Sequence, residues 1–307
     1  MRPFDILGAI VRPPRHNATV AFCSLLSYYA HMKLLSRSAA LALFIVAVVV
    51  GITAASFRMK PIKHVVVMVA MEAEAMPFVE HLNLDKVEGF FPDHVPFIAF
   101  QGLFNEDHKV TVVTNGKDHI YGTGVDNVGT TPAGLAAFLT IDKIKDVDLL
   151  INAGTAGGFK RKGAAIGDVF ITSAVANHDR RIPIPAFTPY GVGKLESKVK
   201  AETMIKNHGW KFGVCTTGNS LDHTEEDGKH MLANDASVKD MEAAAIAWSS
   251  EMHKTPWMGV KVVTDIVDGD VPTQDEFLAN LAAASKSLQE ALPKVLEHVC
   301  GKHHDEL

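Results

Sequence analysis

The chain has 307 residues, of which 47% are hydrophobic and 21% are charged, a composition typical of a folded globular protein and not of a disordered one. Residues 1–60 hold seven of the 30 basic and one of the 35 acidic side chains, so residues 61–307 hold 23 basic and 34 acidic ones, a net charge near −11. A body this acidic offers no broad face for phosphate groups, which argues against DNA or RNA as a partner and favours a small molecule.

The cysteines and histidines show no metal-binding pattern. Cys23, Cys215 and Cys300 lie far apart, without CxxC or zinc spacing, and the 15 histidines include no HExxH motif. We therefore predict no metal and no disulfide framework.

A hydrophobic segment near the start of the chain predicts contact with a membrane. Residues 38–57 are twenty uncharged, mostly aliphatic residues with basic side chains on both sides, long enough to span a bilayer. The small residues at 53–55 also suit cleavage of a signal peptide, so a cleaved signal and a signal anchor both remain open. Because more positive charge precedes the segment than follows it, the body is expected on the lumenal side of the membrane.

The last four residues provide a second targeting signal. His304, Asp305, Glu306 and Leu307 spell HDEL, which returns soluble proteins to the endoplasmic reticulum. We predict a targeting region at 1–60, one main domain at 61–300 and a tail at 301–307. The expected location is the lumen of the endoplasmic reticulum or a lumen-facing anchor, and the alternative is a cytoplasmic protein with an ordinary polar tail.

Within the body, short apolar runs alternate with stretches of helical spacing, a pattern that predicts one α/β domain with a largely parallel sheet. The expected helices cover 128–140, 239–253 and 275–298. Open α/β sheets bind ligands at the carboxyl ends of their strands. The expected strands are residues 64–70, 110–114, 148–153, 168–173, 212–216 and 258–264.

Acidic residues follow two of these strands and open one of the helices. Glu72 and Glu74 come after the first strand, and Asp265 ends the strand at 258–264. Glu242 stands before an alanine-rich helical stretch, where it can bind a ligand diol or only satisfy the helix dipole. Together Glu74, Glu242 and Asp265 suit cleavage of a glycosidic bond, in which one carboxylate positions water, an acid protonates the leaving group and a third group holds the sugar.

The glycine-rich segment at 152–159 allows the backbone to approach a ligand closely. It is not a Walker loop, because Phe159, Lys160 and Arg161 follow the glycines where Gly-Lys-Ser/Thr is needed. Residues 122–127 lack the last glycine of a dinucleotide fingerprint. Neither segment therefore matches a phosphate-binding motif.

Eight segments of the body form a recognisable set, namely residues 70–74, 152–159, 179–185, 190–193, 217–222, 234–236, 239–243 and 264–270. Together they resemble the plant-type methylthioadenosine/S-adenosylhomocysteine nucleosidases, within the nucleoside phosphorylase superfamily. The resemblance implies a three-layer α/β/α sandwich with a central twisted mixed sheet, a homodimer and no cofactor. It also implies hydrolysis of 5′-methylthioadenosine to adenine and methylthioribose in methionine salvage, with S-adenosylhomocysteine as a possible second substrate.

The resemblance also assigns roles to individual residues. Glu74 is expected to activate water, and Asp265 to protonate nitrogen-7 of adenine. Glu242 is expected to hold the ribose hydroxyls. The remaining expected substrate-binding residues are Thr155 beside the ribose and purine, Leu221 and Asp222 beside adenine, Met241 on the sugar, and its neighbours Lys239 and Asp240.

Two alternatives share this fold. Phosphorylases of the superfamily place an arginine where this chain has Asn152, and related plant storage proteins keep the fold without the catalytic groups. Asn219 also departs from the plant pattern, which has an aspartate there, and this leaves the substrate preference open.

Overall fold

The computed structural model of the protein describes residues 60–307, which lie in one compact unit, Met59–Leu307. The apolar segment predicted at 38–57, and all of the 1–60 region except Lys60, fall outside the described residues. No helix among residues 60–307 combines the length and the apolar character needed to cross a bilayer. The proposed boundaries at residues 60 and 300 stay predictions.

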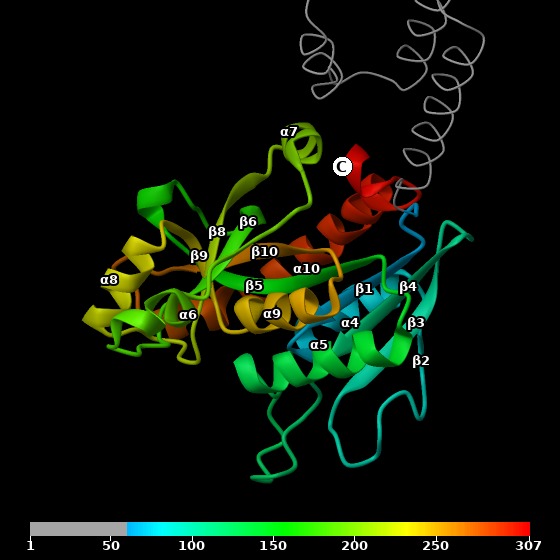
Figure 1. Cartoon of the computed structure of the whole chain (residues 1–307), viewed down its shortest axis with the longest axis horizontal. Coiled ribbons are helices and arrows are strands. Elements are labelled where there is room, and N and C mark those ends of the chain that lie inside the picture. Colours follow the sequence, from blue (N-terminus) through cyan, green and yellow to red (C-terminus); the bar gives the residue numbers. More distant parts are fainter. Residues whose placement is uncertain (1–59) are drawn as a thin grey trace, which may run out of the picture. The chain divides into compact units, whose positions relative to one another are not determined.

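Strands and helices alternate along most of the domain (Figure 1). The strands are β1 (His64–Val69), β2 (Asp85–Lys86), β3 (Ile98–Phe104), β4 (His108–Thr114), β5 (Leu149–Gly158), β6 (Val169–Asn177), β7 (Leu195–Glu196), β8 (Lys211–Thr217), β9 (Ala236–Asp240) and β10 (Trp257–Ile266). The α-helices are α4 (Glu72–His81), α5 (Thr130–Ile144), α6 (Thr188–Val192), α7 (Glu202–His208), α8 (Glu225–Ala233), α9 (Ala243–His253) and α10 (Thr273–Val299). Short 3₁₀ helices cover Lys160–Lys162, Pro185–Phe187 and His304–Glu306.

The strands form one mixed sheet in the order β10-β6-β8-β9-β5-β1-β4-β3-β2, with β7 on β6. Strand β10 also pairs with β5, so β5, β9, β8, β6 and β10 close into a ring. The pairs β1–β5 and β5–β10 are parallel, whereas β5–β9 and β6–β10 are antiparallel. Both types of pairing occur, which confirms the predicted mixed sheet.

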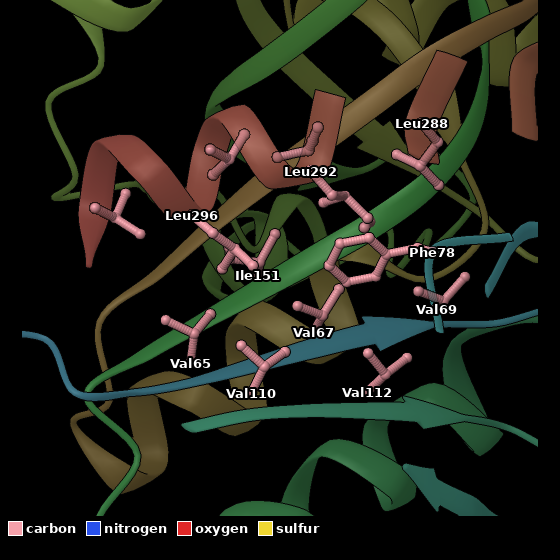
Figure 2. Close-up of a cluster of buried hydrophobic side chains, with 14 of the residues drawn as sticks. Val65, Val67, Val69, Phe78, Val110, Val112, Ile151, Leu288, Leu292 and Leu296 are labelled. Carbon is pink, nitrogen blue, oxygen red and sulfur yellow. The ribbon is translucent and has the colours of Figure 1, made fainter. Parts of the chain in front are cut away.

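One hydrophobic core lies between the sheet and the helices α4 and α10. Successive side chains of a strand point to opposite faces, and Val65, Val67 and Val69 of β1 all enter this core. Figure 2 shows them facing Phe78 of α4 together with leucines of α10. Leu288, Leu292 and Leu296 recur every four residues and form one apolar stripe of that helix.

The second core lies on the other face of the sheet. The alternate β1 residues Val66 and Met68 pack there, with buried alanines of α5 and α9. Small alanine side chains let these helices approach the sheet and each other closely, and α5 packs directly on α9. Two helix layers on opposite faces of a sheet confirm the three-layer sandwich.

The predicted helix at 239–253 is wrong in its first four residues. Lys239 and Asp240 belong to strand β9, which pairs with β8 and with the end of β5. Met241 and Glu242 connect the strand to α9, and Glu242 is the N-cap of that helix. Pairing with two neighbouring strands overrides the local preference for a helix.

The strand predicted at 148–153 continues through the glycine-rich segment, since β5 extends to Gly158. Gly157 lies opposite Asp265 of β10 in the parallel pairing. A Cβ atom at Gly157 would lie 2.6 Å from Asp265 Oδ2, so only glycine fits there without a shift. The glycines therefore let β10 pack on β5 at the position of a predicted site residue.

The end of the chain lies against the start of the domain. The backbone N–H of Gly301 donates to the carbonyl of Ile62, and the N–H of Ile62 donates to that of Lys302. Leu307 is half-buried and packs on the first core. The predicted tail thus contacts the folded body.

Candidate active site

A cavity of about 220 Å³ opens where several strands end. Its walls come from the ends of β1, β9 and β10, the second half of β5 and the first turns of α4 and α10. This is the edge at which α/β sheets bind ligands. The predicted site residues that line it are Glu74, Thr155, Leu221, Lys239, Asp240, Met241, Glu242 and Asp265.

Glu74 lies in the first turn of α4, and its side chain is buried. Its Oε1 accepts hydrogen bonds from the backbone N–H of Thr155 at 2.8 Å and from the Thr155 hydroxyl at 2.5 Å. Burial raises the pKa of Glu74, whereas the Thr155 hydrogen bonds and the charge of Lys261 act in the opposite direction. These contacts favour the ionised form that a base needs.

Glu242 is buried at the N-cap of α9, but its side chain does not cap the helix. The first free N–H groups of α9 are satisfied elsewhere, because Ala243 donates to Asp240 Oδ2 and Ala244 donates to the Thr217 hydroxyl. The Glu242 carboxylate instead accepts a hydrogen bond from Gly129 N at 2.8 Å. Burial and the charge of Asp240 raise the pKa of Glu242 to about 7.

Asp265 comes next to last in β10 and is 2% exposed. Its Oδ1 accepts a hydrogen bond from the hydroxyl of Thr264 at 2.8 Å. Burial raises the pKa of Asp265, and the charge of Glu276 acts in the same direction, whereas Thr264 and the ammonium group of Lys239 lower it. A carboxyl with a raised pKa can hold the proton that a general acid donates.

A buried ion pair lines the same cavity as the two glutamates. Lys261 of β10 and Asp240 of β9 are 2.8 Å apart, and both side chains are almost fully excluded from solvent. Asp240 also accepts hydrogen bonds from the Thr217 hydroxyl and from Ala243 N. Despite burial, the charge of Lys261 and these bonds hold the pKa of Asp240 below its usual value. Asp240 is thus satisfied by protein groups.

Lys239 connects β9 to the loop beside the cavity. Its ammonium group donates to the carbonyls of Ser220 and Leu221 at 2.9 and 2.6 Å, which fixes Leu221 at the cavity wall. Asp222, the next residue, is exposed and does not line the cavity. The structure therefore brings eight of the nine predicted site residues together and leaves Asp222 outside.

Some residues of this site were not predicted from the sequence. Lys261 is the central one, and its signal was a lysine inside an apolar strand, Val260 to Val263. Gly129, Phe277 and Thr273 come from the loop before α5 and from α10 and have no chemical signature in the sequence. Only the packing of distant segments places them here.

Comparison with known proteins identifies the family. The sequence model of the protein family described as "Phosphorylase superfamily" matches residues 64–297. A 5′-methylthioadenosine/S-adenosylhomocysteine nucleosidase of Arabidopsis thaliana is 46% identical over 244 residues, which cover 79% of this chain and 94% of that protein. The chain belongs to this nucleosidase family.

Two further relatives agree with this assignment. A 5′-methylthioadenosine nucleosidase of Arabidopsis thaliana is 42% identical, over 83% of this chain and 94% of that protein. The crystal structure of an MTA/SAH nucleosidase superposes on this protein with a TM-score of 0.77 and a sequence identity of 45%. The match covers 81% of this chain and 100% of that chain. The fold expected for the nucleosidase family is therefore confirmed.

Proposed function

We propose that the protein is an N-glycosyl hydrolase that cleaves 5′-methylthioadenosine to adenine and methylthioribose, a step of methionine salvage. S-adenosylhomocysteine is the second candidate substrate. The observation that carries the proposal is the convergence of Glu74, Glu242 and Asp265 on one cavity in a chain of the nucleosidase family.

The environments of the three carboxyl groups suit three different roles. Glu74, held by Thr155 and supported by Lys261, positions and deprotonates a water molecule. Asp265, protonated, donates to nitrogen-7 of the leaving adenine. Glu242 accepts hydrogen bonds from the ribose hydroxyls and stabilises the positive charge that develops on the sugar.

Water is the favoured nucleophile because no cation among the described residues of the cavity wall is free to bind phosphate. Among the described residues that line it the only cations are Lys239 and Lys261. Lys239 donates to two backbone carbonyls, and Lys261 pairs with Asp240. Asn152, where phosphorylases of this type have an arginine, is buried and neutral.

The storage-protein alternative predicts a similar fold without catalytic groups. Here all three carboxyl groups are retained and buried at the cavity, where isolated acids are costly. Catalysis requires three acids at one small cavity, whereas a reserve protein gains nothing from the cost of burying them. This favours catalysis.

Adenine release tests the proposal and its alternatives together. Purified protein is incubated with 5′-methylthioadenosine or S-adenosylhomocysteine, with and without phosphate, and adenine is quantified. A hydrolase releases adenine equally in both buffers. Release that requires phosphate would identify a phosphorylase, and binding without release would identify a nucleoside-binding protein.

The homodimer proposal rests on an exposed apolar face of α5 and α9. Leu135 and Phe138 of α5 and Trp248 and Met252 of α9 are 40–55% exposed and line one groove. Contiguous apolar patches of this kind mark interaction sites.

Light scattering should give twice the chain mass, and Trp248→Glu should give the monomer. The control Leu278→Glu, at another exposed leucine, should stay dimeric.

The location in the endoplasmic reticulum rests on the apolar segment 38–57 and the terminal HDEL sequence. A fluorescent protein inserted before the HDEL sequence should give a reticular pattern in cells. Deleting the HDEL residues should release part of the protein along the secretory route. Diffuse cytosolic fluorescence of the intact fusion would contradict this location.

A further inference from the structure

The strand that carries Asp265 is irregular at that residue. In the pairing of β10 with β5 the register shifts between Val263 and Asp265, so Thr264 has no partner. A bulge of this kind locally disrupts the hydrogen-bond ladder and turns the neighbouring side chains. The backbone around Asp265 therefore needs support from outside the sheet.

That support comes from α10. Glu276 Oε2 accepts a hydrogen bond from the backbone N–H of Ile266 at 2.7 Å. Asn280, one turn later, donates its side-chain N–H to the carbonyl of Thr264 at 2.9 Å. Residues four apart share a face of a helix, so the two side chains hold the residues before and after Asp265.

The Asn280 side chain is also anchored within α10. The side-chain amide of Asn280 donates to the backbone carbonyl of Glu276 at 2.9 Å. Both side chains are half-buried, and Phe277 between them lines the active-site cavity. The first turns of α10 thus connect the bulge with the substrate cavity.

We propose that Glu276 is a positioning residue for the general acid Asp265, and that Asn280 holds the residue on the other side of the same acid. This inference rests on the proposed hydrolysis and on the acid role of Asp265. Glu276 does not line the cavity, so it acts through the backbone and through its charge. Asp265 faces two charged side chains on the elements packed around it, Lys239 of β9 and Glu276 of α10, and their effects on its proton are opposed.

The direction of the charge effect follows from this geometry. The negative charge of Glu276 makes ionisation of Asp265 less favourable and raises its pKa, so removing that charge releases the proton of Asp265 at lower pH. The alkaline limb of kcat reports the acid in the enzyme–substrate complex. Loss of the charge should therefore move this limb to lower pH.

Two substitutions separate the charge from the hydrogen bond. Glu276→Gln keeps an oxygen that accepts from Ile266 N and should move the alkaline limb of kcat down by about 0.5–1 pH unit, with KM unchanged. Glu276→Ala should show the same shift and a further loss of kcat of about tenfold or more. The matched control is Asp275→Asn, an exposed acid one residue earlier in the same turn, which should leave both quantities unchanged.

Wild-type adenine release is measured first, so that failure of the proposed function is seen separately. If the wild type is active and Glu276→Gln keeps the wild-type pH profile, the inference is wrong. A purely structural role is also distinguishable, because it would lower the melting temperature and kcat without moving the limb.

Discussion

At the scale of single residues, Lys261 is the buried cation between three of the acids. It pairs with Asp240, and its charge lowers the pKa of both Glu74 and Glu242. Burial and ion pairing together therefore tie the protonation of both glutamates to one lysine on β10.

Removing this charge should move the pH dependence. With the pKa of Glu242 at about 7, its ionised fraction falls as the pH falls through 7, and kcat/KM should fall with it. In Lys261→Met both glutamates lose a stabilising cation, so the acidic limb should move to higher pH. The unpaired Asp240 should also lower the free energy of unfolding by about 3–5 kcal/mol.

Lys261→Arg is the matched variant for this test, because it keeps the charge. The profile of kcat/KM is measured between pH 5 and 9 in steps of about one pH unit, and its acidic limb should stay near that of the wild type. A limb that is unchanged in Lys261→Met would show that the lysine has only a structural role.

Asp265→Asn tests the acid directly. Asparagine keeps the size of the side chain and a hydrogen-bonding group but cannot supply the proton, so kcat should fall by about 10²–10⁴-fold. The dissociation constant of 5′-methylthioadenosine, measured by calorimetry, should change little. A variant with wild-type turnover would remove Asp265 from the acid role.

The residue types of the site could be predicted from the sequence, and their surroundings could not. Glu74, Glu242 and Asp265 stand at strand ends or at the start of a helix, and this local position is visible in the chain. Lys261 stands inside an apolar strand and not at its end, and a single lysine in a strand usually points to solvent, so its role in the site was not predicted. Its burial results from the closure of β10 onto β5 and β6, a contact over about 90–110 residues of sequence.

At the scale of elements, the errors occurred where tertiary pairing decides. The strands at 64–70 and 258–264 were predicted close to their observed limits because they are long apolar runs. Strand β9 was not predicted, and its last two residues, Lys239 and Asp240, were assigned to the following helix. Five residues before an alanine-rich stretch carry too little pattern of their own. Its partners on β5 and β8 lie 22 or more residues away.

The pairing of β5 with β10 predicts the effect of a single methyl group. In Gly157→Ala the new Cβ atom would lie 2.6 Å from Asp265 Oδ2 and from Val267 Cγ2. The acid must then move, so kcat should fall at least about tenfold while the melting temperature falls only moderately. Gly228→Ala on α8, where the new atom meets nothing closer than 3.9 Å, should retain full activity. Normal kcat in Gly157→Ala would contradict this packing.

At the scale of the whole molecule, the fold places acids from three separate parts of the chain around one cavity. The parallel strands β1, β5 and β10 bring Glu74, Thr155 and Asp265 to the same edge of the sheet, and the turn after β9 adds Glu242. Helix α10 contributes to both the core and the site. It packs in the first core, and its first turns contact β10, the strand that carries Asp265. The same domain thus combines a stable core with costly buried charges.

The nucleophile is the feature that distinguishes a hydrolase from the phosphorylases of the same superfamily. The most direct measurement is the mass of the sugar product formed from 5′-methylthioadenosine in saturating phosphate. We expect methylthioribose and adenine in equal amounts, because no free cation holds phosphate at the cavity among the residues described. A methylthioribose phosphate ester, or the absence of any adenine, would contradict hydrolysis by this site.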